Sequence, residues 1–153
     1  MATLYGTVAA KQNAPTNKDP LYPIETLPNT RKLLLTYVMT GDEVAADIVR
    51  LYKLPPGCIV LPKTSTVTGD AVATTATITV GLYDLDGVVI DADKYSTALD
   101  VAAAGSDTFT GGAAATTPYT NTVEAWLTFT FATLGTPVAG KKLDFYVDVN
   151  FPA

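Results

Sequence analysis

Apolar and polar residues alternate with a period of two along most of the chain after residue 33. Every odd-numbered residue from 143 to 151 is apolar, and so is every odd-numbered residue from 123 to 131. The even positions of the second segment form the opposite face, which carries Trp126 among polar residues. Because successive side chains of a strand point to opposite faces, this pattern predicts half-buried strands.

Similar alternation and short apolar runs predict further strands at 33–40, 46–54, 58–67, 76–82, 86–90 and 99–103. Turn residues separate these segments, including the Pro-Pro-Gly sequence at 55–57 and Asp86-Gly87. The 25 threonines against three glutamates also favour strands over helices. We therefore expect an all-β fold, a β-sandwich or jelly roll of about eight antiparallel strands.

Two segments interrupt the strand pattern. Residues 91–98 predict one short helix, with Asp91 as its cap and Asp93 in its first turn, preceded by a hairpin turn at 84–87. Residues 104–122 are small, polar and rich in glycine, and we expect them to form a long surface loop.

The first 32 residues differ from the rest. Four prolines recur between residues 15 and 28, and Leu21, Tyr22, Ile24 and Leu27 are spaced among them. Proline favours extended backbone, so we expect an extended N-terminal arm, 1–32, followed by a sandwich body, 33–153. The apolar side chains of the arm, with Arg31 at its end, can lie either on the chain's own body or on a neighbouring subunit.

The charge divides at the same point. Residues 1–32 carry four cations and two acids, whereas residues 33–153 carry six cations and thirteen acids, for a net charge of -5. An acidic body has no general electrostatic reason to bind nucleic acid or an anionic membrane. The split is consistent with ordinary solubility charge or with an arm that docks on a partner while the bodies repel one another.

The chain lacks histidine and has one cysteine, Cys58. This composition excludes Ser-His-Asp and Cys-His catalytic sites and histidine-ligated metals, and Cys58 fits a small core residue. Four aspartates lie within ten residues: Asp84, Asp86, Asp91 and Asp93. Clustered carboxylates can bind calcium, but these lack the spacing of a calcium-binding loop, and a hairpin turn followed by a capped helix explains them as well. The sequence does not decide whether they bind calcium. We expect no enzyme, no cofactor and no metal.

No basic-then-apolar leader opens the sequence, and its longest apolar stretch is too short to cross a bilayer. We therefore expect synthesis and folding in a cytoplasm and no membrane partner.

Three segments in order resemble small head proteins of tailed bacteriophages, of the capsid decoration or cement kind. They are 54–61 (LPPGCIVL), 80–84 (VGLYD) with 91–95 (DADKY), and 139–147 (AGKKLDFYV). The resemblance spans about residues 40–150 and does not include the arm. It implies a structural virion protein on the capsid surface, made in the host cytoplasm. It further implies a homotrimer that binds the major capsid protein and bridges capsid subunits.

A second interpretation is a carbohydrate- or receptor-binding β-sandwich module of a phage tail or fibre. Such a module needs an exposed tyrosine or tryptophan platform, for which Trp126 and Tyr119 are the candidates.

Overall fold

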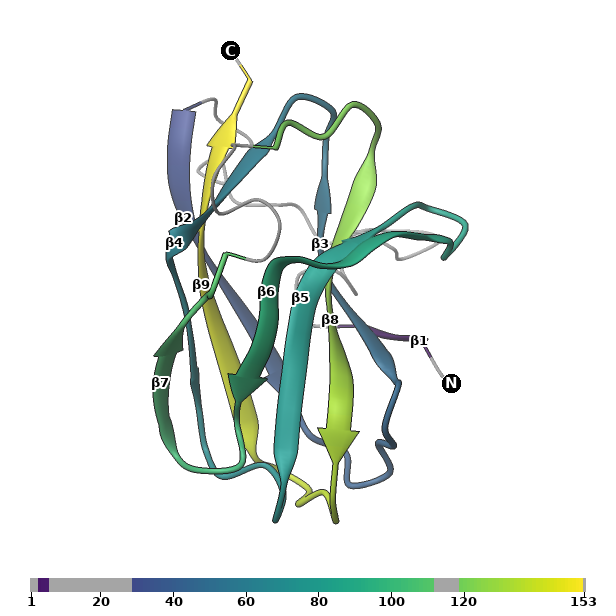
Figure 1. Cartoon of the computed structure of the whole chain (residues 1–153), viewed down its shortest axis with the longest axis vertical. Helices are drawn as coiled ribbons and strands as arrows, with labels where there is room; N and C mark the ends of the chain where they lie inside the picture. The colour runs from purple at the N-terminus through teal and green to yellow at the C-terminus, as the bar shows by residue number, and fades with distance from the viewer. Residues whose placement is uncertain (1–2, 6–28, 112–118, 153) are drawn as a thin grey trace, which may run out of the picture.

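The chain folds into two β-sheets packed face to face (Figure 1). The computed structural model describes residues 3–5, 29–111 and 119–152. In these residues it forms nine strands and no helix. The strands are β1 (Thr3–Tyr5), β2 (Asn29–Val38), β3 (Ile48–Leu54), β4 (Ile59–Gly69), β5 (Ala76–Tyr83), β6 (Val89–Asp100), β7 (Gly105–Thr108), β8 (Ala125–Leu134) and β9 (Lys142–Phe151).

One sheet has the order β1-β3-β8-β5-β6, and the other has the order β2-β9-β4-β7. Every pair is antiparallel except β1 with β3, which is parallel. The predicted all-β sandwich of about eight antiparallel strands is confirmed, with β1 as an additional short strand at one edge.

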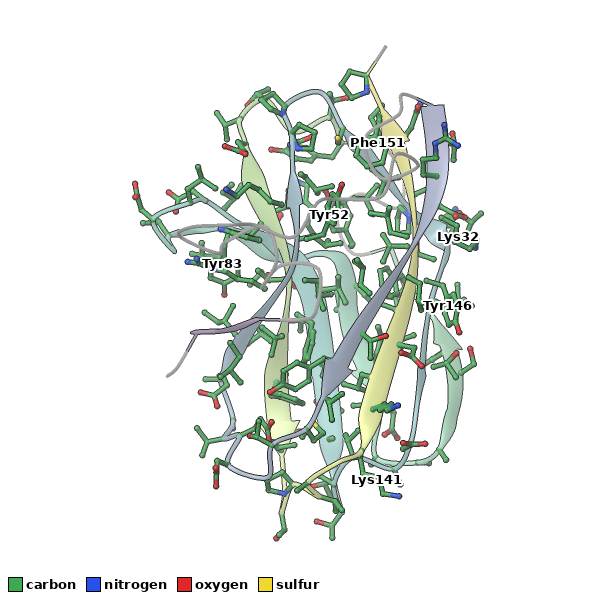
Figure 2. The ribbon with its side chains drawn as sticks, turned by 180° about the vertical axis from the view of Figure 1, so that it is seen from behind. Lys32, Tyr52, Tyr83, Lys141, Tyr146 and Phe151 are labelled. Carbon is green, nitrogen blue, oxygen red and sulfur yellow. The ribbon has the colours of Figure 1, made fainter. Side chains whose placement is uncertain are left out.

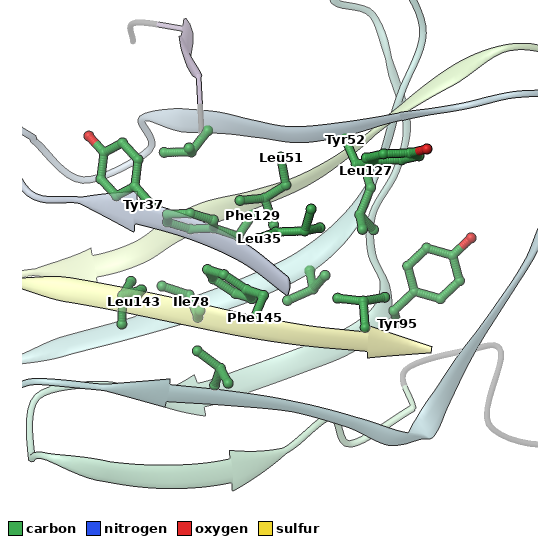
Figure 3. Close-up of a cluster of buried hydrophobic side chains, with 14 of the residues drawn as sticks. Leu35, Tyr37, Leu51, Tyr52, Ile78, Tyr95, Leu127, Phe129, Leu143 and Phe145 are labelled. Atoms are coloured by element: carbon green, nitrogen blue, oxygen red, sulfur yellow. The ribbon is translucent and has the colours of Figure 1, made fainter. Parts of the chain in front are cut away.

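The core lies between the two sheets (Figure 3). Phe129 of β8 stacks on Phe145 of β9, with ring centroids 4.9 Å apart, and so joins the central strands of both sheets. Tyr37 and Phe131 meet Phe129 edge-on, at 5.6 Å and 5.2 Å. Such aromatic contacts add specific geometry to the burial of apolar area that drives folding.

The alternation in β9 agrees with the prediction. The apolar odd-numbered residues from 143 to 151 are buried, whereas the intervening residues are partly or fully exposed. The pairing of β9 with β2 on one side and β4 on the other explains this pattern, because β9 is central in its sheet and only one face meets the core.

The prediction for β8 is confirmed on one face only. Ala125, Leu127, Phe129 and Phe131 face the core, but Val123 precedes the strand and is exposed. Trp126 and Thr128, on the opposite face, are buried as well. A central strand covered on both faces shows no clean polar side, so alternation in sequence underestimated its burial.

The predicted helix at 91–98 is wrong, because this segment belongs to strand β6. The buried residues Tyr95 and Leu99 are four apart, a spacing that fits a helix face as well as a strand face. The backbone N–H and C=O groups on the free side of β5 need hydrogen-bonding partners. Residues 91–98 provide them by pairing with β5, and they are therefore a strand.

The predicted loop at 104–122 also needs correction. Residues Gly105–Thr108 form the edge strand β7, which pairs with β4 and is exposed throughout. Thr120 forms an isolated bridge with Ile59, and residues 112–118 lie outside the described residues.

Both ends of the predicted arm that the structure describes join sheets. Strand β1 pairs with β3 at residues 3–5, and β2 begins at Asn29. Residues 6–28 between them lie outside the described residues.

Candidate interaction surface

The connection between β5 and β6 is a tight hairpin. The Asp84 carbonyl accepts the Gly87 N–H at 3.3 Å, and the Asp84 N–H donates to the Val88 carbonyl at 2.9 Å. Gly87 has a φ of +87°, as a three-residue hairpin loop with a left-handed final residue requires. The predicted turn at 84–87 is therefore confirmed.

The Asp84 carboxylate strengthens this turn by accepting the Val88 N–H at 2.7 Å. Gly87 also lies near Arg50 of β3, since a Cβ added to Gly87 would be 3.3 Å from Nη2 of Arg50. The hydrogen bonds define the geometry of the turn.

The hairpin bends away from the rest of its sheet. In Figure 1 the paired ends of β5 and β6 run to the right past β8, so that the turn lies beyond the packed strands. The register shifts at three places along the pair, and residues 92–95 of β6 lie opposite the single residue Gly81 of β5. Extra residues on one strand bend and twist a β ladder, which accounts for the departure of the hairpin.

The hairpin tip, which we define as residues 85–90, is exposed at all six positions. Four of them are large apolar residues: Leu85, Val88, Val89 and Ile90 are 42%, 61%, 53% and 40% exposed. Single exposed apolar residues are common on protein surfaces, but four within six residues concentrate exposed apolar area at the end of one hairpin. In Figure 2 Tyr83, where the hairpin begins, lies on the opposite side of the molecule from Lys32 and Tyr146.

Carboxylates flank this apolar patch. Asp84 and Asp91 have partners within the chain, the turn N–H and the Lys94 ammonium at 3.3 Å. Asp86 and Asp93 are exposed. The pKa of Asp93 is raised, chiefly by its hydrogen bond with Asp91, because two neighbouring carboxyl groups resist simultaneous ionisation.

The contacts of these aspartates also concern the calcium site considered from the sequence. The carboxylates of Asp84 and Asp91 are engaged by a backbone N–H and by Lys94. Within the described residues, no group of three or more histidine, cysteine or acidic side chains is placed to hold a metal ion.

The aromatic residues considered for a sugar site lie elsewhere. Trp126 is 1% exposed, and Arg50 and Lys53 each place their cationic group 5.3 Å from its ring centroid. Lys94 lies 4.4 Å from the ring centroid of Tyr119, which is partly buried. The chain's own cations thus occupy both rings, and Trp126 offers no exposed stacking surface.

A buried carboxylate, that of Glu43, lies in the loop between β2 and β3. Glu43 is 3% exposed and accepts hydrogen bonds from the Tyr37 hydroxyl, the Thr40 N–H and hydroxyl, and the Gly41 N–H, at 2.6–2.9 Å. Burial alone would raise the pKa of Glu43, but these hydrogen bonds outweigh it and hold the pKa below its ordinary value of 4.5. The network closes the loop and is structural.

Replacing Glu43 with glutamine should lower the free energy of unfolding at pH 7 by about 1–3 kcal/mol, because the acceptor loses its charge and one carboxylate oxygen becomes an NH2 group that cannot accept. A carboxyl with a depressed folded pKa stabilises fully above its unfolded pKa and loses that contribution as the pH falls through the folded value. Urea unfolding of both proteins at several pH values should therefore show the difference shrinking below about pH 4.5. A constant difference down to pH 2.5 would contradict this assignment.

The predicted interface residues are only partly described. Leu21, Tyr22, Ile24 and Leu27 lie outside the described residues. Arg31 is half-buried in β2, where it pairs in register with Val149 of β9. The structure thus places one of the five and brings none of them together.

Sequence reasoning missed the hairpin tip. It located the turn and a strand at 86–90, of which Val89 and Ile90 belong to β6, but it did not predict their exposure, and it assigned residues 91–98 to a helix. The available signal was the unbroken apolar run from Val88 to Ile90 directly after Asp86-Gly87. Residues next to a tight turn lie at the end of a hairpin, where few other strands are available to cover them.

The prediction of Cys58 as a small core residue is confirmed. Cys58 is buried in the core, and burial raises the pKa of its thiol to about 11, so it stays protonated. Among the described residues, no helix is long and apolar enough to span a membrane.

The sandwich is similar to chains in three phage capsid structures. A chain in the capsid of Ralstonia phage GP4 matches with a TM-score of 0.73 and 16% identity, over 99% of both chains. A chain in the cyanophage Pam1 capsid asymmetric unit matches with a TM-score of 0.60 and 23% identity, over 92% of this chain and 97% of that one. A third, in the acidic stable capsid of Helicobacter pylori bacteriophage KHP30, gives 0.51 and 17%, over 81% and 94%.

No protein-family model matches the sequence, and no curated protein matches it. At these low identities the likeness concerns the fold, and it spans almost the full length of each neighbour. The chain therefore shares the fold of chains from three phage capsids.

Proposed function

We propose that this chain is a structural protein of a phage virion. It binds the outside of the capsid as an oligomer, a homotrimer, and stabilises the shell by bridging subunits of the major capsid protein. It is synthesised and folded in the host cytoplasm, acts without catalysis and binds no nucleic acid.

The observation that carries this proposal is the match over nearly whole chains to three phage capsid structures. The match covers most or all of the sandwich and not one common motif, which supports a structural role in a phage virion. The acidic body supports attachment to a protein shell in preference to attachment to DNA. Repeated copies on a symmetric shell also need little affinity each, because multivalency raises avidity.

The arm supplies one contact with the shell in this proposal. Deleting residues 1–31 would remove β1 and the start of β2, so the loss of binding by that variant would not isolate the arm. Four substitutions in the full chain, L21S, Y22S, I24S and L27S, leave both strands intact. We expect this variant to bind shells of the major capsid protein of the same phage at least tenfold more weakly, at an unchanged midpoint of thermal unfolding.

Cosedimentation with the shells measures the binding, and calorimetry measures the midpoint. If the four side chains pack on the chain's own body, the midpoint will fall instead, and the arm will not be a capsid contact. Equal binding by the variant and the wild type would also contradict a contact between the arm and the capsid. Light scattering tests the trimer, which requires a particle of three times the 16.0 kDa chain mass.

A further inference from the structure

The hairpin tip, residues 85–90, has the features of a docking element. Its four large apolar residues are exposed on a hairpin whose turn is closed by hydrogen bonds. Burying such a patch removes apolar area from water, and a rigid turn loses little conformational entropy on binding. Both properties favour a contact with another protein.

The charges around the tip indicate which kind of surface it fits. Residues 84–93 contain four aspartates, of which Asp86 and Asp93 are exposed. The cations beside them are Lys94, which pairs with Asp91 at 3.3 Å, and Arg50, whose Nη2 lies 3.3 Å from the Cβ position of Gly87, so the exposed charge of the hairpin itself remains acidic. A second sandwich body is a poor partner, since residues 33–153 carry thirteen acids and only six cations. A recess lined by apolar side chains and bordered by lysine or arginine is complementary to both parts of the tip.

We propose that the hairpin tip inserts into an apolar recess, bordered by basic side chains, on a capsid subunit other than this chain. This inference rests on the proposed function and adds to it a second contact, separate in sequence from the arm. The apolar residues Leu85, Val88 and Val89 supply affinity. The exposed carboxylates of Asp86 and Asp93 orient the tip toward the basic border and raise the association rate, and salt screens both effects.

The test compares two matched triple variants of the full chain. The tip variant is L85S/V88S/V89S, and the control is L34S/V44S/V123S. The three control residues are 55%, 57% and 53% exposed, against 42%, 61% and 53% for the tip residues, and the residue types are the same. Both variants should unfold at the wild-type temperature within about 2 °C, since surface substitutions rarely change stability much.

We expect the tip variant to cosediment with shells of the major capsid protein of the same phage at least tenfold more weakly than the wild type, and the control to bind within threefold of the wild type. A further variant, D86N/D93N, should bind more weakly at low salt and lose part of the salt dependence. Light scattering should give the same particle mass for all the proteins.

Other outcomes separate the two proposals. If the wild type binds but the tip variant binds as well as the control, the tip is not a docking element, and the proposed function survives. If the tip variant loses its oligomeric state, a second copy occupies the tip and the inference is wrong. If the wild type does not bind shells at all, the proposed function fails and the inference fails with it.

Discussion

Replacing Phe129 with alanine is expected to lower the free energy of unfolding by about 3–5 kcal/mol, a large part of the stability of a domain of this size. Phe129 is fully buried at the centre of β8. Its ring stacks on Phe145 of the facing sheet and meets Tyr37 and Phe131 edge-on. The substitution therefore leaves a cavity where the two sheets meet, and it removes three aromatic contacts at once.

Urea unfolding monitored by circular dichroism measures this effect. The midpoint should fall while the dependence on denaturant concentration stays constant, since the surface exposed on unfolding hardly changes. Alanine at Val44, which is exposed, should stay within about 0.5 kcal/mol of the wild type. A loss below 1.5 kcal/mol for the Phe129 variant would mean that the two sheets are not joined through this ring.

The sequence predicted the parts of the fold that depend on local pattern. Strand β9 was read correctly because it is central in its sheet and has one face toward the core and one toward solvent, so its alternation is complete. The hairpin turn was also read correctly, because Asp86-Gly87 carries a conformational preference of its own.

The errors occurred where tertiary pairing overrides local pattern. In β6 the buried residues Tyr95 and Leu99 are compatible with a helix, and the choice depends on β5, which needs a partner at its edge. Strand β7 is exposed at every position, so its sequence carries no burial signal, and only its register with β4 defines it.

The exposure of the hairpin tip was missed for a similar reason. An apolar run usually predicts burial, and the turn signal beside this one does not show how far the paired strands extend from the sandwich. The bend depends on the mismatch between Gly81 and residues 92–95, which exists only once the two strands are paired. The arm residues Leu21 to Leu27 remain a prediction from composition.

Gly81 makes that mismatch possible, and alanine there should cost about 3 kcal/mol or more. A Cβ at Gly81 would overlap the carbonyl oxygen of Asp91 and the backbone of Ala92. Backbone atoms cannot rotate aside as a side chain can, so β6 would have to move as a unit. Gly140 is the matched control, because it has open space around its Cβ position and only a positive φ of +81°, for which alanine costs about 1 kcal/mol.

The two variants should differ in where the damage lies as well as in its size. In the Gly81 variant β6 is pushed from β5, so amide hydrogen exchange should accelerate along β6 and through the hairpin turn, and much less in β9. In the Gly140 variant the change should stay near the start of β9. Equal stability losses, or exchange that rises uniformly across both sheets, would show that the close approach of β6 to Gly81 does not determine the path of the hairpin. Because the bend begins at Gly81, its substitution should also displace the apolar tip, and binding to capsid shells should then fall even under conditions in which the variant remains folded.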